Sequence, residues 1–183
     1  MKKTSIEKNL TEGSVVKQLI QFALPFMLSN LIQTLYNVAD MLIVGNYSGT
    51  IGISGVNIGG QVTFIMTNIV IGLTAGGTVI IAQYLGSGDR KNMRESISTL
   101  ITFLLIASVA FTVIMLMLSD VILRLIQTPA EAYQQARDYL DVTLLGTVFI
   151  FGYNAFSAIL RGLGDSKRPL VFVTIACVIN IFL

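Results

Sequence analysis

Long apolar runs without any charged residue alternate with short polar segments along this chain. The charge-free runs cover residues 18–39, 41–88, 96–119, 142–160 and 169–183. A helix needs about 20 mostly apolar residues to cross a bilayer core about 30 Å thick. The second run is too long for one crossing, and turn-forming residues interrupt it at 45–50. The pattern predicts an all-α, polytopic membrane helical bundle with crossings at 16–44, 51–83, 97–118, 139–160 and 169–183, the last one cut off.

The composition agrees with a membrane protein and excludes several kinds of active site. Charged residues make up 12% of the chain and hydrophobic residues 54%, whereas soluble domains carry about 25% charged residues. Histidine is absent and Cys177 is the single cysteine, which excludes disulfides within the chain and cysteine- or histidine-based metal sites. No phosphate-binding loop of the ATPase type occurs. We therefore expect no enzyme activity and no cofactor.

The basic residues indicate the orientation of the crossings. Alternating crossings put residues 1–15, the loop after 51–83 and the loop after 139–160 on one side. Together with Lys17 at the start of the first crossing, that side holds ten of the twelve basic residues, and the other side holds Arg124 and Arg137. Positive loops stay in the cytoplasm, so we expect a multi-pass cell-membrane protein with a cytoplasmic N-terminal tail, residues 1–15. Because the basic residues lie in loops, the net positive charge does not indicate a nucleic-acid partner.

One stretch inside the first crossing is unusually polar. In a helix Asn30, Gln33, Asn37 and Asp40 share one face, and Tyr36 borders it. A carboxylate in a membrane helix costs about 2.5–3.5 kcal/mol on insertion scales, so such residues usually face a bundle interior or a water-filled cavity. The face is either a functional site or a patch that holds helices together.

Proline and glycine mark expected bends and contacts. Pro25 lies inside the first crossing, where it removes a helical hydrogen bond and acts as a static bend or a hinge. The pairs Gly55/Gly59 and Gly72/Gly76 have the spacing that lets membrane helices approach closely.

Three connections carry capping signals. Gly86 or Gly88 suits a helix C-cap, and Asp89 an N-cap. The Gly-x-Gly-Asp sequence at 162–165 echoes residues 86–89, either as an internal repeat or as the same loop chemistry used twice. Thr128 and Glu131 form a capping-box pattern, which predicts a helix that starts there and continues up to Leu160.

Three segments together resemble the MATE (multidrug and toxic compound extrusion) transporters, and the resemblance covers the whole chain. They are Pro25 with Tyr36-Asn37-Val38-Ala39-Asp40, then 82–89 (Ala-Gln-Tyr-Leu-Gly-Ser-Gly-Asp), and 160–169 (Leu-Arg-Gly-Leu-Gly-Asp-Ser-Lys-Arg-Pro). The resemblance implies the N-terminal lobe of a twelve-helix antiporter that exports organic cations and other drugs by alternating access. It uses H⁺ or Na⁺, and a lone carboxylate serves either ion.

The resemblance also implies roles for individual residues. Asp40 would be the ion-coupling carboxylate, and the only place for Na⁺, with Asn154 and Asn180 as polar partners. Gln33, Tyr36 and Asn37 would line the drug cavity. The partners would be the lipid bilayer, small-molecule drugs and a C-terminal lobe.

The chain departs from the family at its end. In the family an aspartate follows four residues after the asparagine that matches Asn180, whereas this sequence stops at Leu183. We therefore expect an incomplete N-terminal part. The alternatives are a lipid-linked oligosaccharide flippase of the same superfamily, a small dimeric transporter, and a non-transporting membrane assembly subunit.

Depth along the helices links two of these residues. At about 1.5 Å per residue, Asp40 lies roughly 8 Å below the outer end of its helix, near Gly45. Asn180 lies about 16 Å from the cytoplasmic end of the last crossing, at Pro169. In a core about 30 Å thick both residues therefore belong to the outer half. We predict that they share one polar pocket between the first and last crossings, and a structure with Asp40 facing lipid would refute this.

Single-cysteine labelling tests the orientation. Cysteines at Ser48 and Ala130 should react with an impermeant reagent from outside, and cysteines at Arg90 and Lys167 should not, because the latter lie on the positive side. Labelling of position 167 from outside would invert the assignment.

Overall fold

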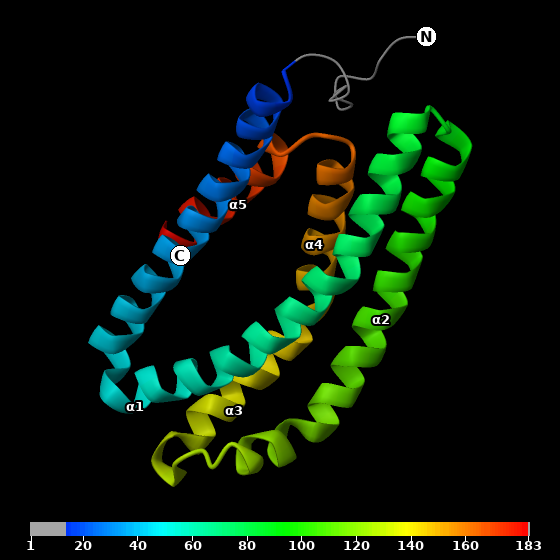
Figure 1. Ribbon diagram of the computed structural model, residues 1–183. Helices are drawn as coiled ribbons and strands as arrows, with labels where there is room; N and C mark the ends of the chain where they lie inside the picture. The colour runs from blue at the N-terminus through cyan, green and yellow to red at the C-terminus, as the bar shows by residue number, and fades with distance from the viewer. Residues whose placement is uncertain (1–13, 183) are drawn as a thin grey trace. The chain divides into compact units, whose positions relative to one another are not determined.

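The computed structural model describes residues 14–182, which form five helices and no strand (Figure 1). The helices are α1 (Val15–Ser87), α2 (Arg90–Leu125), α3 (Ala130–Leu145), α4 (Thr147–Gly162) and α5 (Lys167–Phe182). The predicted all-α class is confirmed. Most of the expected cytoplasmic tail, residues 1–15, lies outside the described residues.

A single glycine divides the longest helix. α1 has 73 residues, which would extend about 110 Å if straight, far more than a bilayer core of about 30 Å. Gly49 breaks it, with φ 63° and ψ −160°. That conformation is essentially restricted to glycine, because a Cβ would clash with the backbone. Gly49 lies inside residues 45–50, where the sequence predicts a turn.

Helix length and hydropathy identify the segments that can cross a membrane. α1 and α2 each pass this test, and α3 and α4 pass it together across a bend of 52°. The continuous helix predicted up to Leu160 is therefore wrong at Gly146. The N–H of Gly146 reaches Val142 O at 3.2 Å, whereas the N–H of Phe149 reaches Gly146 O at 3.0 Å in a tighter turn. Glycine has a low helix propensity, and the helix bends at this residue.

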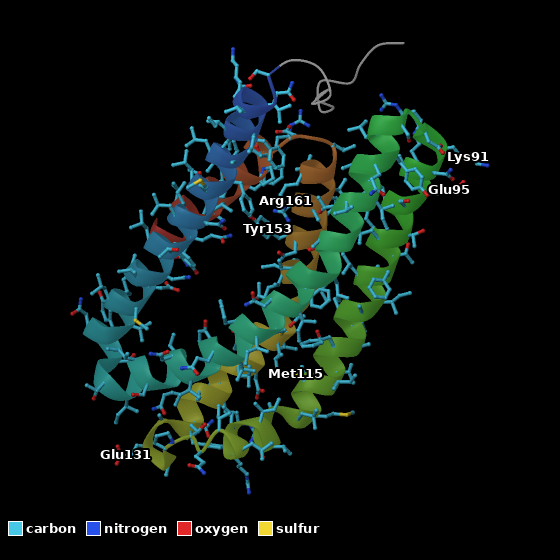
Figure 2. All side chains as sticks on the ribbon, viewed as in Figure 1. Lys91, Glu95, Met115, Glu131, Tyr153 and Arg161 are labelled. Carbon is cyan, nitrogen blue, oxygen red and sulfur yellow. The ribbon has the colours of Figure 1, made fainter. Side chains whose placement is uncertain are left out.

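The chain forms two compact units, each with its own apolar cluster. Unit 1 comprises residues 1–39, 73–100 and 155–183, and unit 2 comprises 40–72 and 101–154. In unit 2 the fully buried residues Met66 of α1, Leu123 of α2 and Leu140 of α3 pack together, and Met115, labelled in Figure 2, packs against them. In unit 1 Ile81 of α1, Met93 of α2 and Ile159 of α4 form the cluster.

Only one of the two predicted glycine pairs makes a close helix contact. A Cβ on Gly59 would lie 2.7 Å from Tyr139 Cδ1 and 3.2 Å from Ala136 O, and one on Gly55 would lie 2.6 Å from Gln135 Cβ. Cβ atoms on Gly72 and Gly76 would meet nothing within 4 Å. The second pair was therefore predicted wrongly, because its spacing permits an approach that no described neighbour makes.

Two loops of unit 1 share one conformation. Gly88 ends α1 with φ 76°, and the N–H of Asp89 bonds Tyr84 O at 3.0 Å. Gly164 has φ 83°, and the N–H of Asp165 bonds Leu160 O at 2.8 Å. This is the Schellman arrangement, which favours glycine.

The two aspartates then cap the helices that follow. Asp89 Oδ1 accepts from the N–H of Asn92 at 3.1 Å, and Asp165 Oδ1 accepts from the N–H of Lys167 at 3.0 Å. The predicted caps at Gly88 and Asp89 are confirmed, and residues 162–165 use the same chemistry.

The predicted capping box at Thr128 is wrong. α3 begins at Ala130 with Pro129 at its N-cap, and no side chain caps it. Thr128 Oγ1 is buried, with no hydrogen-bond partner among the described residues. Pro129 has extended backbone angles (φ −57°, ψ 138°) and itself occupies the N-cap position. Thr128 therefore lies one residue too early in the sequence to cap the helix. Glu131 (labelled in Figure 2) still lies in the first turn, where the helix dipole favours an acid.

Polar contacts join α2 to α3 beyond the predicted crossing at 97–118. Asp120 Oδ1 accepts from the Tyr133 hydroxyl at 2.7 Å and from the Arg137 guanidinium. The Tyr133 hydroxyl, followed by the charges of Arg137 and Arg124, lowers the pKa of Asp120. The stabilisation that the ionised Asp120 carboxylate gives to the folded protein is present at neutral pH, and it is lost as pH falls through the lowered pKa. It is modest, because both ends of the ion pair are 40% exposed.

A matched pair of glycine substitutions tests the packing. Gly59→Ala should destabilise the protein by about 1–3 kcal/mol, because the added methyl overlaps α3. Gly76→Ala should be neutral or stabilising by up to about 1 kcal/mol, because its methyl meets open space and alanine favours the helix. Thermal unfolding in detergent measures both, and equal losses would contradict the assigned contact.

Candidate functional site

The polar face predicted for the first crossing lies on one uninterrupted stretch of α1. Residues 30–40 are helical, and the described break in α1 is at Gly49. Asp40 is half-buried, whereas Asn30, Gln33 and Asn37 are exposed. The helical spacing therefore holds, and the carboxylate is the more shielded end of the face.

One hydrogen bond joins two of the predicted site residues. Asn180 of α5 donates through Nδ2 to the Tyr36 hydroxyl at 3.4 Å, and both side chains are half-buried. The distance exceeds the usual 2.7–3.2 Å for such bonds, so this one is weak. The two residues are 144 positions apart in sequence. α5 thus brings an amide against the polar face of α1 within unit 1.

Asn154 is held by its own helix. It is 8% exposed, and its Nδ2 donates to Ile150 O at 2.8 Å. This bond satisfies part of a buried amide, which would otherwise lose its contact with water. Asn154 and Asp40 belong to unit 2, whereas Asn180 and Tyr36 belong to unit 1. The shared pocket of Asp40 and Asn180, and the role of Asn154, stay predictions.

Pro25 is buried and causes no break in the helical backbone of α1. The Ser29 hydroxyl, itself buried, donates to Pro25 O at 2.9 Å. Proline removes one helical N–H, and a hydroxyl bonded back to the preceding turn bends a helix slightly. This turn of α1 is therefore held less tightly by its backbone than its neighbours.

A cation near Pro25 was missed by the sequence reasoning. Arg161, labelled in Figure 2, lies in the last turn of α4, with its guanidinium carbon 5.7 Å from the centre of the Phe26 ring. Such cation–π contacts are worth about 0.5–1 kcal/mol at exposed sites and more when desolvated. The side chain of an arginine directly after an apolar run can lie back along its own helix. The sequence does not show which aromatic side chain it then contacts.

The described residues contain no group of three or more histidine, cysteine or acidic side chains suited to a metal ion. Cys177 of α5 is half-buried, with a free thiol. The polar face of α1 offers a lone carboxylate, three amides and a phenol, and within unit 1 the amide of Asn180 on α5 lies beside that phenol. These groups can exchange a proton, coordinate a small cation weakly and donate hydrogen bonds to a ligand.

Comparison with known proteins identifies related sequences over almost the entire chain. The MatE family model matches residues 25–183. The "Probable multidrug resistance protein YpnP" of Bacillus subtilis is 34% identical over 172 residues, which are 94% of this chain and 39% of that protein. The "Probable multidrug resistance protein NorM" of Thermotoga maritima is 35% identical over 91% of this chain and 36% of that protein.

The chain is similar in fold to a solved structure. That structure is described as the outward-facing conformation of a multidrug resistance MATE family transporter of the MOP superfamily. The TM-score is 0.88 at 29% identity, over 93% of this chain and 38% of that one. The chain spans 36% to 39% of the length of the two curated relatives.

Proposed function

Because the chain belongs to the MatE family, we propose that it is part of a multidrug efflux transporter that exports organic cations or similar drugs. It is a multi-pass membrane protein, with helices long and apolar enough to cross a bilayer. H⁺ or Na⁺ would be the coupling ion, the bilayer and a C-terminal lobe its partners, and the cytoplasm the side of its N-terminus. The names of the relatives support drug export.

The observation that carries the proposal is the isolation of Asp40. It is the only charged residue between Lys17 and Asp89, and it is half-buried in α1. A carboxylate in such a position is a candidate for an ion pathway, because an apolar residue would be cheaper to insert. Binding of a proton or Na⁺ would neutralise it and lower the free-energy penalty of surrounding it with apolar groups.

Exchange requires that the ion and the drug favour different conformations or compete for one site. Neutralised Asp40 would favour the drug-releasing state, and ionised Asp40 the state that holds a cationic drug. Asn154 and Asn180 would assist ion binding, and Gln33, Tyr36 and Asn37 would contact the drug. The hydrogen bond from Asn180 to Tyr36 supports a link between these two sets.

One observation favours a second candidate, a flippase for lipid-linked oligosaccharides. The pyrophosphate of such a substrate requires cationic groups, and Arg161 of α4 is a half-buried cation over Phe26. A single arginine provides only one of the cationic groups that a pyrophosphate requires. The efflux antiporter is therefore the preferred function.

Replacement of the carboxylate tests the coupling. Asp40→Asn in the protein at its natural length should lower the gradient-driven export of ethidium by about 5- to 150-fold, the range of typical coupling energies. Efflux from loaded cells measures this, with membrane abundance checked by immunoblot. Absence of ethidium export by the unaltered protein would favour the flippase instead.

The matched control is Asp138→Asn, the same chemical change at an exposed position of α3. Asp138 accepts a hydrogen bond from Gln134 Nε2 at 2.8 Å, so the substitution should leave export unchanged. Equal losses in both variants would mean that Asp40 has no special role.

Pro25→Ala tests the hinge. We propose that α1 bends near Pro25 during exchange, which is supported by the missing backbone donor and the back-bonded Ser29. Restoring the N–H should straighten this turn and slow ethidium export several-fold, without loss of membrane abundance. Pro129→Ala, at an exposed proline before α3, is the control. Unchanged export in the Pro25 variant would reduce the residue to a static bend.

A further inference from the structure

Basic side chains gather at one end of unit 1. Within the described part of this unit there are seven basic and three acidic residues, whereas unit 2 has two basic and five acidic ones. Figure 1 shows the starts of α1, α2 and α5 at the same end of unit 1. The exposed basic residues at these helix starts are Lys17, Lys91, Arg94 and Lys167, which we name the basic end.

Packing holds the two loops of the basic end together. Ile81 of α1, Met93 of α2 and Ile159 of α4 form the apolar cluster just behind the loops. Thr78 Oγ1 of α1 also lies 3.2 Å from Ala158 O of α4, and a Cβ on Gly162 would lie 3.0 Å from Thr78 O. The α1–α2 and α4–α5 connections therefore lie next to each other, above closely packed ends of α1, α2 and α4.

Internal interactions do not account for these charges. Asp89 and Asp165 cap α2 and α5, but the first turns themselves contain no acidic residue. A helix N-terminus disfavours the Lys and Arg side chains that lie there. Arg168 is paired with Asp165, at 3.4 Å. No ion pair is described for Lys91, Arg94 or Lys167 among residues 14–182. Figure 2 shows Lys91 pointing outward from α2.

We propose that the basic end binds the headgroups of anionic phospholipids. In a multi-pass protein the ends of the crossing helices lie at the level of the lipid phosphates. Exposed Lys and Arg side chains there are attracted by an anionic membrane surface, and clusters of four to eight of them mark lipid-binding segments. The headgroup phosphates supply negative charge beside Lys91, Arg94 and Lys167, for which no ion pair is described among residues 14–182.

The test compares lipids on the purified protein at its natural length. Native mass spectrometry is used to titrate it with phosphatidylglycerol, which is anionic, and with phosphatidylcholine, which is zwitterionic. Phosphatidylglycerol should bind more tightly. Lys91→Gln should weaken its binding about fivefold, the effect of one basic residue near the surface. Phosphatidylcholine binding should not change, and Lys91→Arg should retain the native affinity.

Arg124→Gln is the matched control, because it removes one positive charge from an exposed side chain of unit 2. It should leave the binding of both lipids unchanged. Lys167→Gln replaces Lys91→Gln if the latter melts below the native protein in phosphatidylcholine. Equal affinity for the two lipids, equal losses in the Lys91 and Arg124 variants, or full competition by inorganic phosphate at the lipid concentration would each overturn the proposal.

Discussion

A hydrocarbon core that cannot solvate charge is the constraint on which this structure depends. It keeps Lys, Arg, Asp and Glu out of the long apolar runs, so that residues 18–39 and 41–88 contain none of them. It also requires every backbone group to find a partner within the protein, which in lipid leaves helices or closed barrels. Asp40 is the exception among residues 18–88. The apolar sequence around this single carboxylate is therefore the reason to expect that it has a function.

The same constraint governs the small polar side chains inside the helices. Hydroxyls that have no water to bond reach back to a carbonyl one turn earlier on their own helix. Thr63, Thr67, Thr112, Thr143 and Thr174 all do so, at 2.8–3.1 Å. Asn154 and Asn68 use their amides in the same way. A hydroxyl or amide that bonds back to its own helix is thus by itself no sign of a site, and Asn180 differs because it bonds a tyrosine on another helix.

Most of the fold was readable from the sequence, because the features involved are local. Charge-free runs predicted helices, residues 45–50 contained the break at Gly49, and Gly88 and Asp89 carried their caps. The errors involve geometry that the sequence does not display. Gly76 has the spacing for close packing but meets no described helix, and a glycine at 146 weakens the helix without specifying a bend of 52°.

The candidate site was readable in part. Spacing placed the polar residues of α1 on one face, and family resemblance picked out Asn180, which lies against Tyr36. The contact of Arg161 with Phe26 was missed, because a ring at residue 26 and a cation at 161 have no sequence relation. The pairing of Asp40 with Asn180 is a tertiary question of the same kind, since they fall in different units.

The central claim is that one carboxylate links ion and drug, and ion release on drug binding measures it most directly. Ethidium is added to the purified protein of natural length in weakly buffered solution, and protons released or radioactive Na⁺ displaced are counted. Linkage between the two ligands predicts release from the unaltered protein and none from Asp40→Asn, although that variant still binds ethidium. Undiminished release from Asp40→Asn would contradict the account.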